Sequence, residues 1–552
     1  MIKLIISRYL WLWLVFLWIA IPFARAQEGL PGEQVEVIAN FEAQLLEVEK
    51  LPIAPSLPPA DTTRPRLSYE LTPRTLSIDY PPPRIRPLAF RADPLPPAYN
   101  GYVRAGVGLP QSIYGEASYH IFTNKIADML FYMKHHQANL SNDQVENQAF
   151  AQTALGAKGT YYGDLGFGVQ GHMDYSADRV HFYGYNFDGT DTSGIRPEEV
   201  RQIFKTFSTG ATIYNTTQNI GDINYNAGFD LYLLSDNYAA RETGLLLSLD
   251  ATKWIAQTHP LHIGIEVDLS GYEDTTTQNL NTYTLNPSFA FHGDVFKVKG
   301  GLRIVSFNQE FSVYPDVEAT LQLVGNKLMA FAAAQGDRQK NTFRALSTYN
   351  PFIASRFPAL TLKTTDYLDL YGGIKGNLNV VSYSGKVGYK RANDLPMFVL
   401  DTTDVSIRRR FATLYDTARI FYVAGSLLVH PFQGVELGGA VRQNVYTLNN
   451  QPKPWHLPAF TLNAFATYTG LDDALRVRTD LFVENGVPVP AADGSPDNLN
   501  GLFDLSLAVD YRFTQHISLW MQLNNLLNNK RQRWQYYPTY GLNFLVGASA
   551  RF

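Results

Sequence analysis

Charged residues in this sequence recur at every second position within apolar stretches. Arg478 and Asp480, for example, alternate with Val477 and Leu481. In a strand, this spacing puts the two kinds of side chain on opposite faces. A polar face of this kind suits a wet interior, where its charges either select solutes or simply hydrate the lumen and balance charge. Ten residues are predicted to line such a lumen: Asp222, Asp230, Glu266, Asp268, Arg476, Arg478, Asp480, Glu484, Asp510 and Arg512.

Catalytic and metal-binding motifs are missing from the sequence. It contains no G-x-S-x-G, no H-E-x-x-H and no P-loop. The pair His135-His136 has no convergent third ligand in sequence, so we expect it at a strand end rather than at a metal. Without cysteine, disulfides and thiolate metal sites are excluded. We therefore predict no enzyme activity, no metal site and no cofactor.

The composition favours barrel strands over a soluble domain. Only 17% of residues are charged, whereas 33 Tyr and 33 Phe raise the aromatic share to 13%. Removing residues 1–26 leaves 43 basic and 50 acidic residues, a net charge of −7. Because no basic cluster accompanies this charge, the sequence argues against a nucleic-acid partner.

The first 98 residues differ from the rest. Residues 1–26 combine Lys3 and Arg8, an apolar run and Ala24-Arg25-Ala26, which is the pattern of a cleaved signal peptide. Residues 27–98 form a predicted periplasmic segment, with 13 of the 31 prolines between positions 51 and 98. Such a segment runs extended or irregular. It contains a short β-prone stretch, 33–38, which would either remain a disordered leader or be bound by a partner through strand addition.

Residues 99–552 repeat the alternating pattern about 22 times, in stretches long enough to cross a membrane as tilted strands. Short breaks are expected near 123–125, 163–164, 293–294, 325–326, 376–377 and 514–516. Long breaks are expected near 138–148, 177–199, 338–361, 392–416, 487–499 and 526–540. Short and long connections at opposite ends are typical of outer-membrane barrels. The sequence therefore predicts an all-β, transmembrane antiparallel β-barrel.

The closing stretch supplies a resemblance. Leu523 to Lys530, Arg533-Trp534, Gly541 to Phe544 and the final Ala550-Arg551-Phe552 resemble the last strands of TonB-dependent-receptor-type outer-membrane barrels. The resemblance implies a 22-stranded barrel that imports large or scarce solutes and is opened by an inner-membrane energy-coupling protein. It also implies that Phe552 is a signal for the barrel-assembly machinery.

The sequence departs from that family in one respect. Family members carry a plug domain before the barrel, whereas the 72 residues between the predicted signal and barrel, 27–98, leave no room for such a domain. We therefore expect a plugless relative. Glu33, Val35 and Val37 are faintly similar to the family's short energy-coupling segment.

These patterns predict a protein of the Gram-negative outer membrane, in contact with its lipid. The first functional hypothesis is a receptor- or channel-type barrel for uptake of an unidentified solute. The alternative is a structural or assembly subunit that holds envelope partners through residues 27–98. An outer-membrane enzyme is the third and weakest hypothesis.

Overall fold

The computed structural model describes residues 99–123, 126–142, 145–187, 195–217, 221–355, 362–402, 408–491 and 493–552. All of them belong to the second of two units into which the chain divides, Ala98–Phe552. The predicted signal peptide, the proline-rich segment and the stretch from Glu33 to Val37 lie outside these residues. Within the described part, no helix is long and apolar enough to cross a membrane.

The described chain consists largely of strands that form one sheet. Its first half contains β1 (Gly101–Leu109), β2 (Ser112–Thr123), β3 (Ala127–Asn142), β4 (Val145–Gly163), β5 (Phe167–His181), β6 (Arg201–Asn215), β7 (Ile223–Asp236), β8 (Arg241–Ile255), β9 (His259–Glu273), β10 (Thr277–Asn279), β11 (Thr282–His292) and β12 (Phe296–Phe307). Its second half contains β13 (Glu310–Val324), β14 (Leu328–Lys340), β15 (Thr364–Asn377), β16 (Val381–Leu400), β17 (Phe411–Val429), β18 (Val435–Leu448), β19 (Phe460–Gly470), β20 (Leu475–Asn485), β23 (Leu502–Arg512), β24 (Ile517–Asn524) and β27 (Asn543–Arg551).

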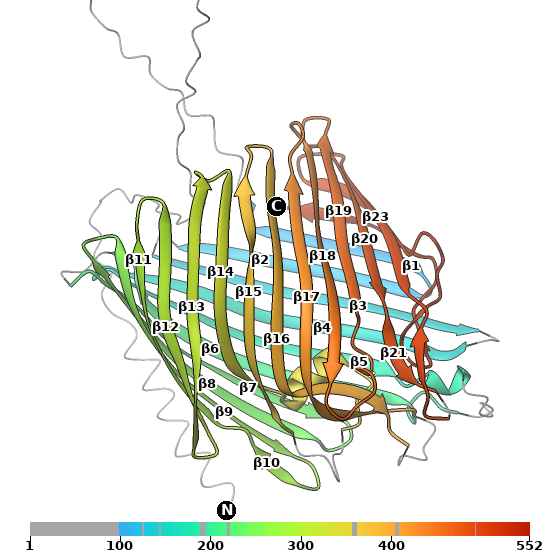
Figure 1. Ribbon diagram of the computed structural model, residues 1–552. Coiled ribbons are helices and arrows are strands. Elements are labelled where there is room, and N and C mark those ends of the chain that lie inside the picture. Colours follow the sequence, from blue (N-terminus) through green and yellow to red (C-terminus); the bar gives the residue numbers. More distant parts are fainter. Residues whose placement is uncertain are drawn as a thin grey trace, which may run out of the picture. The chain divides into compact units, whose positions relative to one another are not determined.

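The sheet closes on itself as an antiparallel barrel (Figure 1). The short β10 pairs only with β9, and β11 continues the same pairing, so β10 and β11 together form one interrupted barrel strand. The 23 strands of the sheet therefore correspond to a 22-stranded barrel. Closure comes from β1 and β27, which pair from Tyr102 opposite Arg551 to Leu109 opposite Phe544. Because every barrel strand then has a partner strand on both sides, no backbone edge is exposed to lipid.

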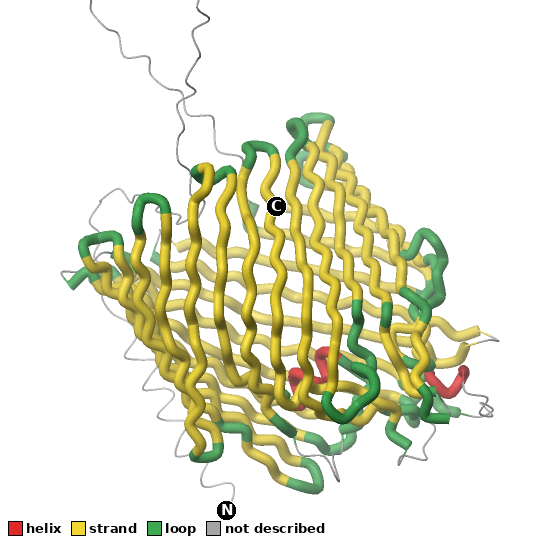
Figure 2. The backbone as a smooth tube through the Cα atoms, viewed as in Figure 1, coloured by secondary structure: helices red, strands yellow, loops and turns green. Residues whose placement is uncertain are grey.

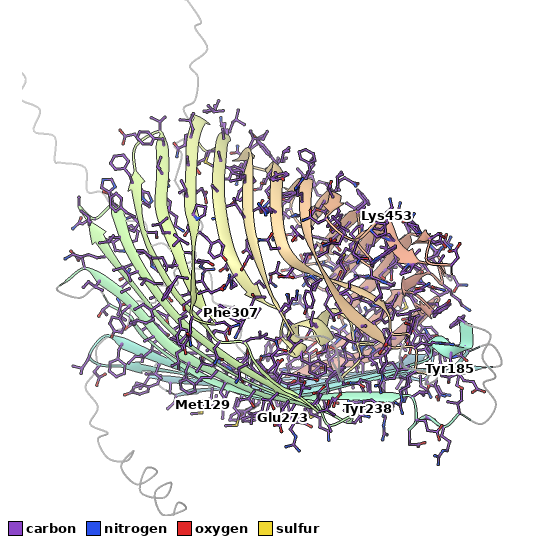
Figure 3. All side chains as sticks on the ribbon, turned by 60° about the horizontal axis from the view of Figure 1, so that its bottom comes forward. Met129, Tyr185, Tyr238, Glu273, Phe307 and Lys453 are labelled. Carbon is purple, nitrogen blue, oxygen red and sulfur yellow. The ribbon has the colours of Figure 1, made fainter. Side chains whose placement is uncertain are left out.

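The alternation of the sequence determines the two faces of the wall. Val313, Val387 and Val423 are 60%, 46% and 46% exposed on the outer face, as expected for side chains that contact lipid. The residues between them carry the polar side chains that face the lumen, and Figure 3 shows side chains leaving both faces of the sheet. The sequence-based prediction of a 22-stranded transmembrane barrel is thereby confirmed.

The two ends of the barrel differ in their connections (Figure 2). Short turns join β2 to β3, β4 to β5, β11 to β12, β13 to β14, β15 to β16 and β23 to β24, as predicted. The long connections lie at the other end. They contain the 3-10 helix η1 (Gly184–Phe187), the helix α2 (Phe343–Tyr349) and two small hairpins, β21 (Val487–Pro490) with β22 (Pro496–Leu499) and β25 (Gln532–Trp534) with β26 (Tyr537–Pro538).

Two of the predicted long loops are shorter than expected. The region 138–148 is mostly strand, because β3 continues to Asn142 and β4 begins at Val145. Likewise β16 continues to Leu400 and β17 begins at Phe411, within the loop expected at 392–416. The ends of β3 and β4 are mostly polar, whereas β16 ends in the unbroken apolar run Leu395 to Leu400. Neither extension alternates, so the pattern that marks lipid-facing strands ends before the strands do.

Candidate functional site

The long connections pack together into a hydrophobic cluster, called the loop core below. Its buried members are Phe182, Tyr185, Val200, Phe204, Leu234, Ala240, Tyr272, Leu280, Phe343, Leu346, Phe352, Ile353, Leu362, Phe398, Phe411, Trp534 and Tyr537. They come from connections and strand ends distributed around the barrel, from β5 to β27. The loop core thus joins the rim from β5 to β17 to the connection between β24 and β27.

Hydrogen bonds between different loops hold the loop core together. The Tyr183 hydroxyl donates to the carbonyl of Pro538 at 2.8 Å, joining the β5–β6 and β24–β27 connections. The Tyr537 hydroxyl donates to the carbonyl of Arg408 at 2.8 Å, joining the latter connection to the one between β16 and β17. A single-residue bridge pairs Ile353 with Phe411. Four connections that are far apart in sequence are thus bonded to one another.

Aromatic stacking forms the centre of the loop core. The rings of Phe352 and Tyr537 are stacked with centroids 3.8 Å apart. The imidazole of His456 stacks on Trp534 at 5.3 Å and meets Phe411 edge-on at 5.0 Å. Stacked and edge-to-face aromatic pairs add about 0.5–1.5 kcal/mol each beyond the burial of their area. The centre of the loop core is therefore held by ordered aromatic packing.

His456 is a fully buried polar residue within this packing. The pKa of its imidazole is lowered to about 4, chiefly by burial and also by the nearby Arg533, whereas the hydrogen bond to the carbonyl of Phe398 acts in the opposite direction. The Nδ1 atom lies 2.7 Å from that carbonyl and donates to it, while Nε2 accepts from the backbone N–H of Gln535 at 3.3 Å. Both ring nitrogens are satisfied only in the neutral form.

Helix α2 connects the loop core to a cavity. Thr342 caps its first turn, accepting from the N–H of Ala345. The carboxylate of Glu242 on β8 accepts from the N–H groups of Phe343 at 2.5 Å and Arg344 at 3.1 Å, which fixes the helix N-terminus against the wall. Phe343 and Leu346 then enter the loop core, whereas Arg344 and Thr348 line the cavity.

The cavity against α2 has a volume of about 680 Å³ and a strongly charged wall. Two of the predicted lumen residues, Glu266 and Asp268, meet here. Asp268 pairs with Lys340 at 2.5 Å, and Arg303 pairs with Asp337. Arg344 lies over the Tyr232 ring at 4.4 Å. A wall with fixed cationic donors and anionic acceptors suits a polar solute that bears both anionic groups and cationic or donor groups.

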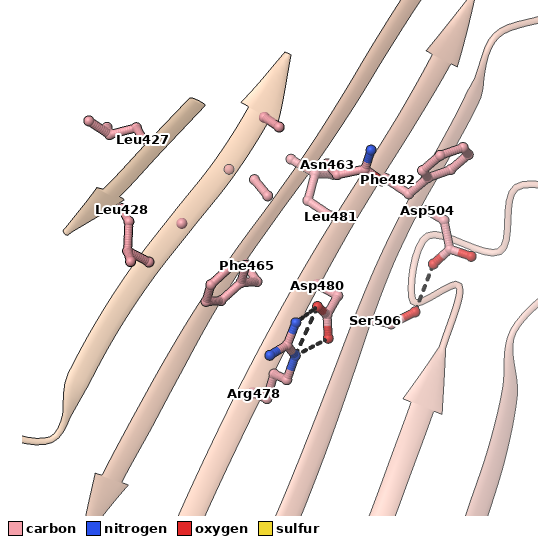
Figure 4. A pocket seen from close by; sticks show the side chains of 14 residues that line it. Leu427, Leu428, Asn463, Phe465, Arg478, Asp480, Leu481, Phe482, Asp504 and Ser506 are labelled. Carbon is pink, nitrogen blue, oxygen red and sulfur yellow. Dashed lines mark hydrogen bonds and ion pairs between the residues drawn. The ribbon is translucent and has the colours of Figure 1, made fainter. Parts of the chain in front are cut away.

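A second cavity of about 600 Å³ lies further along the wall, against β17 to β20 and β23 (Figure 4). Arg478 donates to both carboxylate oxygens of Asp480, with the closest contact at 2.7 Å, and its guanidinium lies 4.6 Å from the Phe465 ring centroid. Asp504 accepts from Ser506 at 2.8 Å. The predicted pair Arg478 and Asp480 is thus brought together, at a site separate from Glu266 and Asp268.

The other predicted lumen residues are dispersed. Asp510 pairs with Arg104 at 3.2 Å, and Arg476 lies opposite Asp510 in register. Asp230 lies 3.4 Å from His172, and Glu484 pairs with Arg533 of the loop core region at 3.0 Å.

Two predicted residues lie at the short-turn end. Arg512 donates to the carbonyl of Asp472 at 2.7 Å. Asp222 precedes β7 with a φ of 50°, so it belongs to a turn rather than to a strand. No single binding site therefore unites the ten residues.

Sequence reasoning missed the residues of the loop core. Within the aromatic stretch from Trp534 to Tyr540, the structure places Trp534 and Tyr537 in the loop core. Arg338, Lys340 and Arg344 also went unnoticed, because they lie at or beyond the end of β14, where the alternation stops. Within the described residues, no group of three or more His, Asp or Glu side chains could hold a metal ion.

Comparison with known proteins supports the fold. No protein-family model and no curated protein matches the sequence. Solved structures do match. The FrpB iron transporter from Neisseria meningitidis (F5-1 variant) superimposes with a TM-score of 0.65 at 11% identity, covering 83% of this chain and 83% of that one. The ferric yersiniabactin uptake receptor FyuA from Yersinia pestis gives 0.63 at 12% identity, covering 82% and 80%. The siderophore receptor PirA from Acinetobacter baumannii gives 0.62 at 11% identity, covering 83% and 81%. At these identities the chain is similar to them in fold.

Proposed function

We propose that the protein is a receptor-type uptake barrel of the Gram-negative outer membrane, whose mouth is closed at rest by the loop core. The observation that carries the proposal is the packing of long connections across one end of a wall lined by charged cavities. A solute-specific barrel needs such a barrier, because an unobstructed 22-stranded lumen would pass small molecules without selection. The similar structures, named as iron and siderophore receptors, supply supporting analogy of fold.

The proposal assigns the solute to the cavity against α2. Its wall offers cationic Arg303, Lys340 and Arg344 next to acidic Glu266 and Asp268. Because α2 is shared between this cavity and the loop core, a solute bound to Arg344 would act directly on the helix that closes the mouth. We therefore propose a polar solute with both anionic and cationic or donor groups, whose binding loosens the loop core.

Conductance of the purified chain in planar bilayers tests the closed mouth. The chain from residue 27 should show no open-pore steps. The double variant Phe352→Ala, Tyr537→Ala should show them, because it removes the 3.8 Å stack at the centre of the loop core. Tyr371→Ala is the matched control, since this tyrosine contacts Phe331 on the lumen wall and lies outside the loop core. It should leave the conductance unchanged.

Two results would contradict this function. Large steps from the unaltered chain would indicate an open diffusion channel. Silence of both the chain and the double variant would favour the alternative, a structural or assembly subunit. That alternative depends on residues 27–98, outside the described residues. Deleting them in the same assay shows whether they close the lumen, and a pull-down with them shows whether they bind an envelope partner.

The same proposal includes a barrel without a plug domain, an energy-coupling partner and the barrel-assembly machinery. Energy coupling through Glu33, Val35 and Val37 would require an inner-membrane protein to bind that stretch. Assembly through Phe552 would require the barrel-assembly machinery.

A further inference from the structure

Two exposed arginines oppose each other directly on the front wall of the barrel. Arg391 on β16 and Arg419 on β17 are cross-strand partners in the antiparallel register (Figure 1 shows the two neighbouring strands). Both side chains are exposed. Residues paired in this way have Cβ atoms about 4.5–5.5 Å apart, and like charges at such positions repel one another. This arrangement therefore needs a compensating anion.

The pair faces the lipid side of the wall. Along β16, Arg391 is in phase with Tyr389, which is 43% exposed, and Val387. Along β17, Arg419 is in phase with Phe421, which is 48% exposed, and Val423. These apolar and aromatic neighbours belong to the lipid-contacting face, so the two arginines continue that face and do not enter the lumen.

No carboxylate of the described chain neutralises the pair. The in-register neighbours on the same face are Leu368 on β15 and Thr447 on β18. Asp366, the next residue of that face on β15, is bound by Arg338 through Nε at 2.5 Å and NH2 at 3.0 Å. Among the described residues, Arg391 and Arg419 have no ion pair with an acidic side chain. Within the part of the chain that the structure describes, no side chain supplies the compensating anion.

The pair lies toward the long-connection end of the lipid-contacting face. The apolar residues of β16 and β17 lie between it and the short turns, and Tyr389 and Phe421 adjoin it, as aromatic residues do at a membrane interface. At this depth the surroundings are lipid headgroups. In an outer-membrane barrel, the long connections face the cell exterior, so these are headgroups of the outer leaflet.

We propose that Arg391 and Arg419 form a binding site for the phosphate group of an anionic lipid in the outer leaflet. The proposal rests on the outer-membrane placement made above, and it is independent of solute uptake. Two guanidinium groups a few ångströms apart can hold one phosphate from both sides with charge-assisted hydrogen bonds. The aromatic neighbours Tyr389 and Phe421 would contact the acyl chains below the headgroup. Bound lipid also removes the repulsion between the two cations.

Native mass spectrometry of the folded full chain in detergent tests the site, with bis-phosphorylated lipid A as the probe. Arg391→Ser, Arg419→Ser should weaken lipid binding about thirtyfold, since each arginine near an anionic headgroup is worth roughly a fivefold gain. Arg391→Lys, Arg419→Lys should give an intermediate loss, because lysine keeps the charge but not the bidentate geometry. Lys253→Ser is the matched control: Lys253 is exposed in the same lipid-facing phase, at the short-turn end of β8, and its loss should have no effect.

Each outcome bears on the proposal. Unchanged lipid A binding by the folded serine variant would overturn it, as would equal binding of dephosphorylated lipid A. Displacement of lipid by millimolar inorganic phosphate would show a free-anion site and would also overturn the assignment to lipid. Failure of the conductance experiment would refute the closed uptake barrel while leaving this measurement intact, so the two proposals fail separately.

Discussion

His456 connects the chemistry of a single side chain to the closure of the mouth. It is fully buried, stacks on Trp534, and uses both ring nitrogens in hydrogen bonds that require the neutral imidazole. Burial lowers its pKa to about 4, below the ordinary value of 6.5. The unfolded loop therefore binds a proton more readily than the packed one over the range between these values.

Acidification should open the mouth through this residue. The stability contributed by neutral His456 is complete above pH 6.5 and is lost as pH falls toward 4, by up to roughly 3 kcal/mol at about 1.4 kcal/mol per pKa unit. Conductance should therefore appear on lowering the pH from 7.5 to 4.5. The variant His456→Gln, which can donate and accept without titrating, should remain closed at both values. Equal acid opening in that variant would assign the effect to other groups.

At the scale of elements, the connection between β24 and β27 joins the wall to the loop core. Arg533 in β25 pairs with Glu484 near the end of β20 at 3.0 Å, and the Glu484 side chain is only 6% exposed. The same arginine donates to the Tyr349 hydroxyl of α2 at 3.1 Å. One residue thus holds a strand, a helix and a loop in position.

Removing Arg533 should destabilise this connection. Arg533→Gln would leave a buried carboxylate without its cation, at a cost of about 3 kcal/mol, the lower end of the usual range because Arg533 is partly exposed. Glu484→Gln, Arg533→Gln should recover most of that loss, since no unpaired charge then remains. Urea unfolding from lipid vesicles measures both. If the single variant unfolds like the unaltered chain, the pair contributes nothing to stability.

The elements also show where sequence reasoning succeeds and where it stops. Alternation along β9 and β20 identified these strands and assigned Glu266 and Arg478 to their polar faces, because the period of a strand is local. The stacking of Phe352 on Tyr537 joins residues from two loops, 185 positions apart, and no local pattern records that contact. Asp222 shows a smaller error: it continues the alternation of β7 but lies in the preceding turn.

At the scale of the whole molecule, the last residue completes the wall. The backbone of Phe552 exchanges hydrogen bonds of 2.7 and 3.0 Å with Gly101, and its ring lies where a Cβ on Gly101 would stand, with the nearest atom at 2.3 Å. The ring is 61% exposed on the outer face. The residue proposed as an assembly signal is therefore also part of the seam between the first and last strands.

Replacing Phe552 by Ser should lower the amount of folded barrel in the outer membrane severalfold, because both the exposed aromatic and its contact with Gly101 are lost. Heat modifiability on gels, which separates folded from unfolded barrel, measures the change. Phe513→Ser is a suitable control: this phenylalanine is 69% exposed at the same short-turn end but lies away from the seam. Normal folded levels after the change at Phe552 would count against the signal.

The pairing of β1 with β27 also means that the barrel cannot close before its last strand is available. More than 430 positions separate Gly101–Leu109 from Asn543–Arg551, yet these segments are direct neighbours. The edge of β1 that pairs with β27 therefore has no partner strand until the last strand of the chain is present. Contacts so distant in sequence form slowly, and the waiting edge is open to wrong partners. Closure of the wall therefore depends on the final strand.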